Sequence, residues 1–465
     1  MLTTLAAPAF ADIWHIENGD ITISAGESGN NVTQNNNTTY GDTNTIITNQ
    51  NKDKASSNTV TIEAKDKDDK VEVTLKDVNI DASSRSEAAV SVTGEGNTNI
   101  ELDGDNALKS DIYSSGISSS GSLTISGGEN DSLTAQGGSG ANGISSSGSL
   151  TISGGTVTAN GDDGGRGISS SGSVTISGGS TVTANGGSGT ISGGDGIWSG
   201  GGVTISGGST VTANGGNGGS LVGGDGIRSG GVVTISGNTV NAAGGYGGKV
   251  GGYGICSFDR VAISGGTVEA AGGNGSTGGG SGIYSSVIDL SGSLELTAKA
   301  GSPNGKALSQ KGSELVLDTI KDKLGPGAKV TATDADGKVI DQVSTPRPVE
   351  PEESSSSSDG GSAAPSAPAS PLPGLTVTDK DGQRISYTST QSGNTLTVCV
   401  GRLTASFRIS LAALRQLRAE GIETITFQTI LCSTTLSVDE LLAMGGEDAE
   451  AVLTHRFTDS SLTVG

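Results

Sequence analysis

The sequence contains few of the residues from which proteins of this size build a core or a catalytic site. Aromatic residues make up 3% of the 465 residues and charged residues 16%, and there are 2 histidines and 3 cysteines. The shortage of aromatics argues against a conventional globular core for the whole chain, and the low charge argues against a coiled coil. Both histidines, His15 and His455, lie outside the glycine-rich repeats, which excludes a histidine-based site there.

Basic residues are scarce relative to acidic ones. The 27 Lys and Arg minus the 49 Asp and Glu give a formal net charge of −22. Phosphate backbones would repel such a chain, so nucleic acid is not an expected partner. Three cysteines are too few for a disulfide scaffold. Cys399 and Cys432 lie in the same C-terminal region and could pair, whereas we expect Cys256 to be a small buried or half-buried residue.

The first residues have the features of the end of a secretory signal. Residues 2–11 read LTTLAAPAFA, a short apolar stretch that ends in the small-x-small pattern Ala9-Phe10-Ala11. We therefore interpret residues 1–11 as a signal-peptide remnant, predict cleavage after Ala11, and expect a secreted protein. An apolar tail without a targeting role is the alternative. No later stretch of 18 apolar residues follows, so no membrane span is expected.

Glycine is abundant, with 79 residues, and it punctuates an internal repeat. The phrase GISSSGSLTISGG, or a variant of it, begins every 24 to 30 residues, at Gly116, Gly143, Gly167, Gly196, Gly226, Gly254 and Gly282. A second phrase, TVTAN or a variant of it, begins at Thr156, Thr181, Thr210, Thr239 and Thr267. A period of this length indicates a solenoid, in which each short unit buries its apolar face only by stacking on its neighbours.

Within each phrase, apolar and polar residues alternate as they do in short β-strands. In VTISGG, Val203 and Ile205 would point to one side and Thr204 to the other. We predict an all-β solenoid, a single-stranded parallel β-helix whose coils of about 24–30 residues stack ~4.8 Å apart. An array of small β-sandwich hairpins is the alternative. The expected core columns are Ile125, Ile152, Ile176, Ile205, Ile235 and Ile263, and Val157, Val182, Val211, Val240 and Val268.

Asparagine occupies the same place after three of the TVTA phrases, at Asn160, Asn185 and Asn214. In stacked coils these three side chains would lie one above another, where their amide groups can hydrogen-bond along the stack. The spacing therefore predicts an asparagine ladder with a structural role.

Composition divides the rest of the chain into further segments. Residues 12–110 alternate less regularly and are expected to form the first coils and the cap of the solenoid, with the polar stretch 30–54 as a loop or irregular coils. Residues 111–343 carry the glycine-rich repeats and the final coils. Residues 344–374 are rich in Pro and Ser and are typical of an extended linker.

Residues 375–465 predict a separate small α+β domain. Ser410 and Ser437 each precede a helical pattern as expected N-caps. This segment also holds aromatics that the repeats lack, Phe407, Phe427 and Phe457, and can therefore build an ordinary core.

One predicted outward column carries groups suited to sugar recognition. If the isoleucine of each Gly-Ile phrase points inward, the residue after it points outward. That column reads Ser118, Ser145, Ser169, Trp198, Arg228, Cys256 and Tyr284. Aromatic rings can stack on sugar rings and arginine can pair with uronate carboxylates, so we predict a carbohydrate-binding stripe of Trp198, Arg228 and Tyr284. Unrelated surface decoration at the coil edges is the alternative.

A second column precedes the same glycines and contains Asp195 and Asp225 on neighbouring coils. Two carboxylates at that distance repel each other, and a calcium ion between them would relieve the repulsion. Asp103 and Asp105 in ELDGDN form a second calcium candidate. The alternative for the first pair is two solvated turn aspartates, and the spacing of an EF-hand loop is absent.

The run VTLKDVNIDASSRSEAAVSVTGEGNTNIELDGDNAL, residues 73–108, is followed by SGSLTISGG and SLTAQGG repeats. These segments resemble the secreted carbohydrate-binding parallel β-helix proteins of Gram-positive bacteria, over roughly residues 58–300. The resemblance implies a right-handed β-helix that binds acidic polysaccharide in association with calcium. No functional residue of that family can be placed on this sequence one by one.

We therefore expect a secreted or cell-surface protein that binds a polysaccharide or a host-surface glycan without catalysis, or that acts as an adhesin. A structural spacer or protein adhesin is the first alternative. A polysaccharide lyase or hydrolase is the second, but it would need clustered acid and base groups, which the repeats do not show.

Overall fold

The structure is a computed structural model. It describes residues 12–346, 374–378, 384–385, 387–392, 394–400, 404–429, 433–446, 449–455 and 460–464. The expected signal remnant 1–11 and most of the expected linker lie outside the described residues. The chain separates into two compact units, Met1–Val349 and Glu350–Gly465, with the boundary inside the linker that the sequence predicts.

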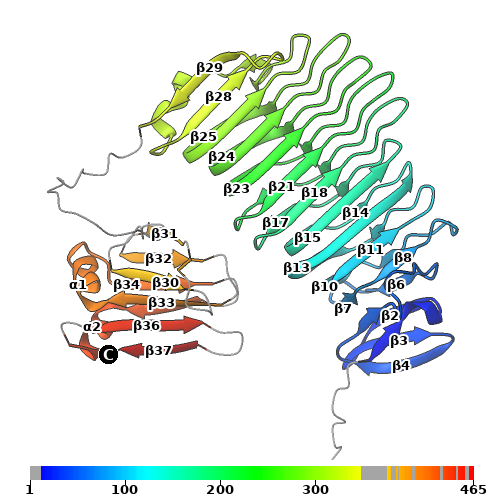
Figure 1. Cartoon of the computed structure of the whole chain (residues 1–465), viewed down its shortest axis with the longest axis horizontal. Coiled ribbons are helices and arrows are strands. Elements are labelled where there is room, and N and C mark those ends of the chain that lie inside the picture. Colours follow the sequence, from blue (N-terminus) through cyan, green and yellow to red (C-terminus); the bar gives the residue numbers. More distant parts are fainter. Residues whose placement is uncertain are drawn as a thin grey trace, which may run out of the picture. The chain divides into compact units, whose positions relative to one another are not determined.

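The first unit is a β-solenoid of stacked parallel coils with about 12 turns, which confirms the predicted fold class (Figure 1). Five short strands carry the Gly-Ile phrase alone: β12 (Ile117–Ser119), β14 (Ile144–Ser146), β16 (Ile168–Ser170), β19 (Ile197–Ser199) and β22 (Ile227–Ser229). Two long strands, β24 (Ile255–Ala271) and β25 (Ile283–Lys299), carry all the phrases of their coil in one run. The other repeat strands are β13 (Ser122–Ser139), β15 (Leu150–Asp162), β17 (Val174–Ser177), β18 (Thr181–Asn185), β20 (Val203–Ile205), β21 (Thr210–Asn214) and β23 (Val233–Ala243).

Both predicted core columns are present. Ile176 pairs in parallel with Ile152 of the preceding coil and with Ile205 of the following one. In the valine column, Val182 pairs with Val157 and Val211 in the same way. No member of either column is more than 1% exposed. This pairing excludes the array of antiparallel hairpins, and it shows how thin stacks of aliphatic side chains replace an aromatic core.

The asparagine ladder is confirmed. The Asn185 amide nitrogen donates to Oδ1 of Asn160 at 2.8 Å, and the Asn214 amide nitrogen donates to Oδ1 of Asn185 at 2.9 Å. Asn185 in the middle thus uses both its oxygen and its nitrogen along the stack, and the three coils are tied together at the same corner.

The N-terminal segment forms the first coils and a cap, as expected, but the polar stretch 30–54 is not a loop. It forms two strands of an antiparallel meander and one strand of a parallel coil. Polar side chains add hydrogen bonds to this backbone pairing: the Asn30 amide nitrogen donates to Thr45 Oγ1 at 2.9 Å, and the Gln34 amide nitrogen donates to His15 O at 2.9 Å. The strands are β1 (Ile13–His15), β2 (Ile21–Gly26), β3 (Gly29–Gln34), β4 (Asn37–Asp42), β5 (Ile46–Thr48), β6 (Val60–Glu63), β7 (Lys70–Lys76), β8 (Asn79–Asp81), β9 (Val90–Thr93), β10 (Asn97–Asp103) and β11 (Asp105–Lys109), with a 3-10 turn η1 (Ile16–Asn18).

The solenoid ends in antiparallel elements at its other end too. β27 (Ser313–Glu314) turns back on β26 (Leu308–Gln310), and β29 (Val339–Ser344) turns back on β28 (Lys329–Thr333). A 3-10 helix, η2 (Leu317–Lys323), lies between these hairpins and buries Leu317 and Ile320. Antiparallel hairpins and a short helix end the stack and so cover the open strand edges of the last coil.

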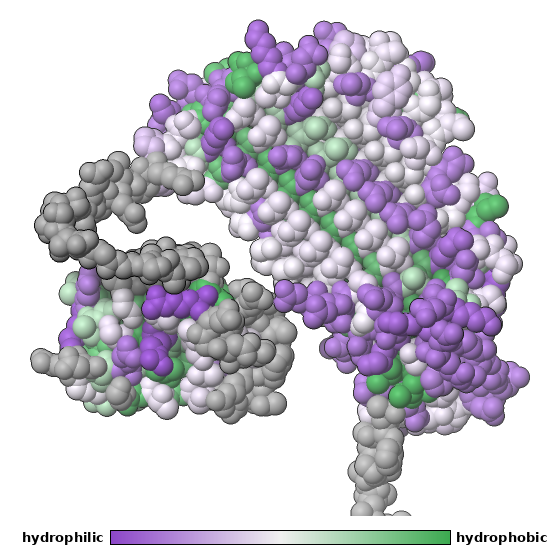
Figure 2. Space-filling model, viewed as in Figure 1, coloured by the Kyte–Doolittle hydropathy of each residue, from purple (hydrophilic) through white to green (hydrophobic). Residues whose placement is uncertain are grey.

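The hydropathy of the surface changes along the solenoid. Figure 2 shows hydrophilic residues gathered over the N-terminal coils, and residues of intermediate hydropathy over much of the central coils. In the repeats the outward positions of the strands are held by Thr and Ser, as in Thr175 and Ser177 of β17. The visible central face therefore offers hydroxyl groups rather than charges.

The glycine-rich connections stack as regularly as the strands. Gly187 donates to Gly165 O of the preceding coil at 2.7 Å, and Gly194 donates to Gly187 O on the other limb of its own loop at 2.9 Å. A Cβ on Gly194 would lie 1.9 Å from Gly165 O, so the loops of neighbouring coils approach more closely than any side chain allows. Close backbone packing is therefore the reason that these loops are built from glycine.

The second unit is a small domain of strands and two helices, as predicted. Its strands form two four-stranded sheets, one of β30 (Leu375–Thr378), β33 (Ala405–Ser410), β36 (Glu450–His455) and β37 (Ser460–Val464), the other of β31 (Thr388–Ser392), β32 (Thr395–Cys399), β34 (Thr424–Gln428) and β35 (Ser433–Ser437). The rings of Phe407 and Phe427, one from each sheet, lie 4.7 Å apart in the core. Phe457, the third expected core aromatic, lies outside the described residues.

Both helix caps of this domain are confirmed. Ser410 accepts a hydrogen bond from the Ala413 N–H at the start of α1 (Leu411–Ala419). Ser437 accepts one from the Glu440 N–H at the start of α2 (Val438–Met444). Cys432, the expected partner of Cys399, lies outside the described residues, so this pairing stays a prediction.

Candidate functional site

The residues of the predicted outward column pair with one another in register, from coil to coil, in the parallel sheet. Trp198 pairs with Ser169 on one side and Arg228 on the other, Arg228 pairs with Cys256, and Cys256 pairs with Tyr284. The stacking of β16, β19, β22, β24 and β25 therefore brings the predicted stripe together on one edge of the solenoid.

The edge differs from the prediction in one member. Cys256 is only 1% exposed, although its position in the register lies between Arg228 and Tyr284. Burial, together with the nearby Asp225 carboxylate, raises the pKa of its thiol to about 12. The expectation of a small buried residue is confirmed: Cys256 keeps its predicted place in the column but is not accessible.

Trp198 is half-buried, and a guanidinium group covers part of its ring. The Cζ atom of Arg166, from the preceding coil, lies 4.4 Å from the Trp198 ring centroid. Arg166 also places its Nε 3.3 Å from Oδ2 of Asp195. The tryptophan is therefore held in one orientation by a cation–π contact that is itself anchored by a carboxylate.

Arg228 makes the corresponding contacts on the next coils. Its Nη1 lies 3.3 Å from Oδ2 of Asp225, and its Cζ lies 5.3 Å from the ring centroid of Phe258. Phe258 is 55% exposed. Tyr284 stacks on Tyr253 with 4.9 Å between ring centroids.

We call this surface the arginine–aromatic edge; it consists of Arg166, Trp198, Arg228, Tyr253, Phe258 and Tyr284. Sequence reasoning placed Trp198, Arg228 and Tyr284 in the stripe but did not select Arg166, Tyr253 and Phe258. Arg166 and Tyr253 stand one residue before the repeat glycine, so their column could have been paired with the stripe. Phe258 follows Cys256 by two residues and gave no signal, because serine or glycine holds its place in the other coils.

The two aspartates of the second column are not solvated turn residues, and that alternative is wrong. Asp195 and Asp225 are 9% and 3% exposed. Oδ1 of Asp195 accepts from the Asp225 N–H at 2.8 Å, and Oδ1 of Asp225 accepts from the Tyr253 N–H at 2.7 Å. Each carboxylate therefore gives one oxygen to the next coil and the other to an arginine of the edge.

This arrangement has an electrostatic cost at Asp225. Burial and the neighbouring Asp195 carboxylate raise the pKa of Asp225 to about 7, against the opposing effects of the Tyr253 N–H and Arg228. The protein itself supplies the positive charge, through Arg166 and Arg228, that the sequence analysis assigned to calcium. A calcium ion at Asp195 and Asp225 stays a prediction without a free carboxylate oxygen to support it.

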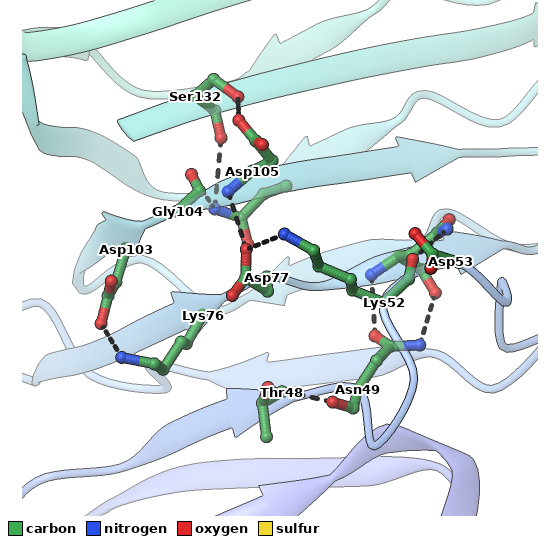
Figure 3. A network of polar contacts seen from close by, with 12 residues as sticks. Thr48, Asn49, Lys52, Asp53, Lys76, Asp77, Asp103, Gly104, Asp105 and Ser132 are labelled. Atoms are coloured by element: carbon green, nitrogen blue, oxygen red, sulfur yellow. Dashed lines mark hydrogen bonds and ion pairs between the residues drawn. The ribbon is translucent and has the colours of Figure 1, made fainter. Parts of the chain in front are cut away.

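The second calcium candidate is also engaged in ties between coils (Figure 3). Asp103 pairs with Lys76 at 2.6 Å, and Oδ1 of Asp105 accepts from the Ser132 hydroxyl at 2.8 Å. The Asp105 N–H donates to Asp77, which also pairs with Lys52. Among the described residues, no group of three or more His, Cys, Asp or Glu side chains is placed to hold a metal ion. Calcium at this place stays a prediction as well.

The fold and the edge together define a parallel β-solenoid protein with an arginine–aromatic surface on one side of its coils. Comparison of the chain with protein-family models, with curated proteins and with solved structures finds no match. In the described part of the chain, no helix is long and apolar enough to cross a membrane.

Proposed function

We propose that this is a secreted or cell-surface protein whose solenoid binds polysaccharide without catalysis, through the arginine–aromatic edge. The observation that carries the proposal is the presence of Trp198, Tyr253, Phe258 and Tyr284 within four successive coils of a chain with only 3% aromatic residues. Aromatic rings held at the spacing of parallel coils, ~4.8 Å, offer flat apolar surfaces on which the CH faces of sugar rings pack.

The geometry of the edge supports this role in a second way. The contacts with Arg166 and Arg228 fix two rings in advance, so a ligand would lose less affinity in ordering them. Thr and Ser hydroxyls on the adjacent strand faces can bond to sugar hydroxyls. The carboxylates that contact the arginines of the edge, Asp195 and Asp225, are buried and already paired, so neither is accessible as the acid or base that glycoside cleavage uses.

A glycan array probed with the full chain tests the proposal, with calcium present and then with EDTA. We expect binding to at least one polysaccharide, weakened about tenfold or more in Trp198→Ala, since stacking by an aromatic ring contributes ~1–3 kcal/mol in comparable sites. Ser145→Ala, in the same column two coils before Trp198, is the matched control and should bind as the wild type does. Absence of binding to every glycan under both conditions would overturn the proposal.

A structural spacer or protein adhesin is the second candidate, and one observation favours it. Some ring faces of the edge are already occupied by other side chains of the protein, because Arg166 covers Trp198 and Tyr253 stacks on Tyr284. If these contacts serve only to stiffen the solenoid, Trp198→Ala will lower the melting temperature without any loss of glycan binding. The same array and a melting curve therefore separate the two candidates.

A further inference from the structure

A pocket lies at the C-terminal end of the solenoid, apart from the residues of the arginine–aromatic edge. It has a volume of about 410 Å³, within the ~300–1,000 Å³ that small-ligand sites occupy. Strands β24, β25 and β26 and the 3-10 helix η2 all contribute to it. Its lining comprises Arg260, Val287, Ile288, Asp289, Gln310, Leu315, Thr319, Ile320 and Lys323.

Most polar groups of this pocket have a partner within the protein, but the guanidinium group of Arg260 has none among the described residues. Lys323 pairs with Asp289 at 3.2 Å, and Oε1 of Gln310 accepts from the Ile288 N–H at 2.9 Å. The Thr319 hydroxyl donates to Val316 O at 2.6 Å. Within the described residues, no hydrogen bond or ion pair is found for the Arg260 guanidinium. Arg260 therefore presents a fork of N–H donors that the protein leaves unused.

The charge of the lining is opposite in sign to that of the chain. Arg260 and Lys323 against Asp289 leave the lining with one net positive charge, in a protein whose net charge is −22. Arginine is the side chain whose planar fork matches a carboxylate with two parallel hydrogen bonds. The lining therefore favours a ligand that carries a carboxylate.

The rest of the lining suits a compact ring. Val287 is 39% exposed and, with Leu315 and Ile320, gives the pocket an apolar wall. The Gln310 amide nitrogen and the Asp289 carboxylate offer a donor and an acceptor at the same pocket. Apolar contact on one face, with polar groups of both kinds beside it, is the pattern to which a sugar ring is complementary.

The pocket and the arginine–aromatic edge share two strands, β24 and β25. Arg260 follows Phe258 by two residues on β24, and the Phe258 ring is the one that Arg228 covers. Arg260 also pairs in register with Val287 of the next coil. A chain of linked sugars bound at Phe258 and Tyr284 would therefore lie on the same two strands that line part of the pocket.

We propose that this pocket binds a uronic-acid unit of a polysaccharide, with the Arg260 guanidinium holding the carboxylate and the apolar wall covering one face of the ring. The proposal rests on the proposed polysaccharide binding for the identity of the ligand as a sugar. The expectation that Arg260 binds a carboxylate depends only on the residues and the charge of the pocket lining.

Calorimetric titration of the full chain with an oligogalacturonate and with its methyl ester tests the proposal, because the ester keeps the sugar and loses the charge. We expect the acid to bind about tenfold or more tightly than the ester, since a hydrogen bond to a charged group contributes ~1.5–3 kcal/mol. Arg260→Gln should remove this preference and leave the ester's affinity unchanged. Lys299→Gln, which deletes an exposed positive charge of β25 outside the pocket, is the matched control and should keep it.

The outcomes separate the pocket from the edge. If Trp198→Ala weakens both ligands and Arg260→Gln changes neither, the edge binds sugar and the pocket proposal is overturned. If Arg260→Gln weakens the acid alone and Trp198→Ala changes neither ligand, the pocket proposal stands and the edge proposal falls. Equal affinity of the wild type for acid and ester, or no binding of either, overturns the pocket proposal directly.

Discussion

The carboxylate of Asp195 accepts a hydrogen bond of 2.8 Å from the backbone N–H of Asp225, one coil further along the solenoid. Asp225 repeats the arrangement with the N–H of Tyr253. Two acidic side chains are thus stacked in a buried column where like charges would be expected to force the coils apart. Arg166 and Arg228, each 3.3 Å from one of the carboxylates, offset the repulsion. The column therefore ties the coils together and also orients the arginines that hold Trp198 and Phe258.

The raised pKa of Asp225 predicts that stability depends on pH. In the folded protein this carboxyl has a pKa of about 7, whereas in the unfolded chain it titrates near its ordinary value of ~3.9. Between these values the folded state binds a proton that the unfolded state has lost, so the free energy of unfolding falls as pH rises. The slope from this group is at most about 1.4 kcal/mol per pH unit. Urea unfolding of the solenoid, followed by circular dichroism at pH 5 and pH 8, measures it.

Asp225→Asn separates this effect from other titrating groups. The amide keeps an oxygen for the Tyr253 N–H but cannot ionise, so the variant should lose part of the dependence between pH 5 and pH 8. Asp105→Asn, which removes an exposed carboxylate from the N-terminal coils, should leave the dependence as in the wild type. An Asp225→Asn protein with the same pH dependence as the wild type would show that Asp225 titrates at its ordinary pKa.

The asparagine ladder predicts unequal effects of the same substitution at neighbouring positions. Asn185 makes two of the amide bonds, to Asn160 and Asn214, whereas Asn214 makes one. Since a hydrogen bond contributes ~0.5–1.5 kcal/mol and unpaired partners add to the loss, Asn185→Ala should cost about 1–3 kcal/mol and Asn214→Ala about half as much. Chemical denaturation measures both. Equal costs would mean that the bonds along the stack contribute little, and that alanine serves as well here as it does at Ala243.

The aliphatic columns and the asparagine ladder could be predicted because the same residues recur at the same places in several repeats. Each coil gives an independent copy of the alternation at Val203, Thr204 and Ile205. Because the coils stack in parallel and in register, residues at equivalent places in successive repeats become neighbours in space. The polar stretch 30–54 had no such copies, and its many Asn residues have a weak intrinsic preference for strands. Its antiparallel pairing depends on contacts with β2 and with the end of the solenoid, which a local pattern does not carry.

The candidate site could be predicted only in part, for a related reason. Alternation gives the direction of a side chain, and it placed Trp198, Arg228 and Tyr284 in one register correctly. It does not say how far a neighbouring side chain reaches across the coil. Cys256 is buried, and Asp195 and Asp225 are buried beside Arg166 and Arg228. The pocket that contains Arg260 depends on η2, an element that lies outside the repeat.

The close packing of the glycine loops predicts a strong effect of one methyl group. A Cβ at Gly194 would lie 1.9 Å from Gly165 O, and the other nearest atoms, Gly165 C and Gly164 O, are also backbone atoms that cannot rotate away. Gly194→Ala should destabilise the solenoid by about 1–3 kcal/mol or more, as overpacking does in cores. At Gly278 the nearest atoms are the Val250 methyl groups at 4.0 Å, so Gly278→Ala is the matched control and should change the midpoint little. Similar midpoints for the two variants would contradict the glycine packing.

The cysteines predict a difference in reactivity that also bears on the Cys399–Cys432 pairing. Cys256 is 1% exposed with a pKa of about 12, so its thiol should resist alkylation at pH 8 until the solenoid unfolds. Cys399 is partly exposed, although burial raises its pKa also, and its Sγ lies 3.4 Å from Oε1 of Gln428. We expect iodoacetamide to label Cys399 in the folded protein, and peptide mass mapping measures both sites. Labelling of Cys399 only after reduction would instead establish a disulfide to Cys432, and rapid labelling of Cys256 would contradict its burial.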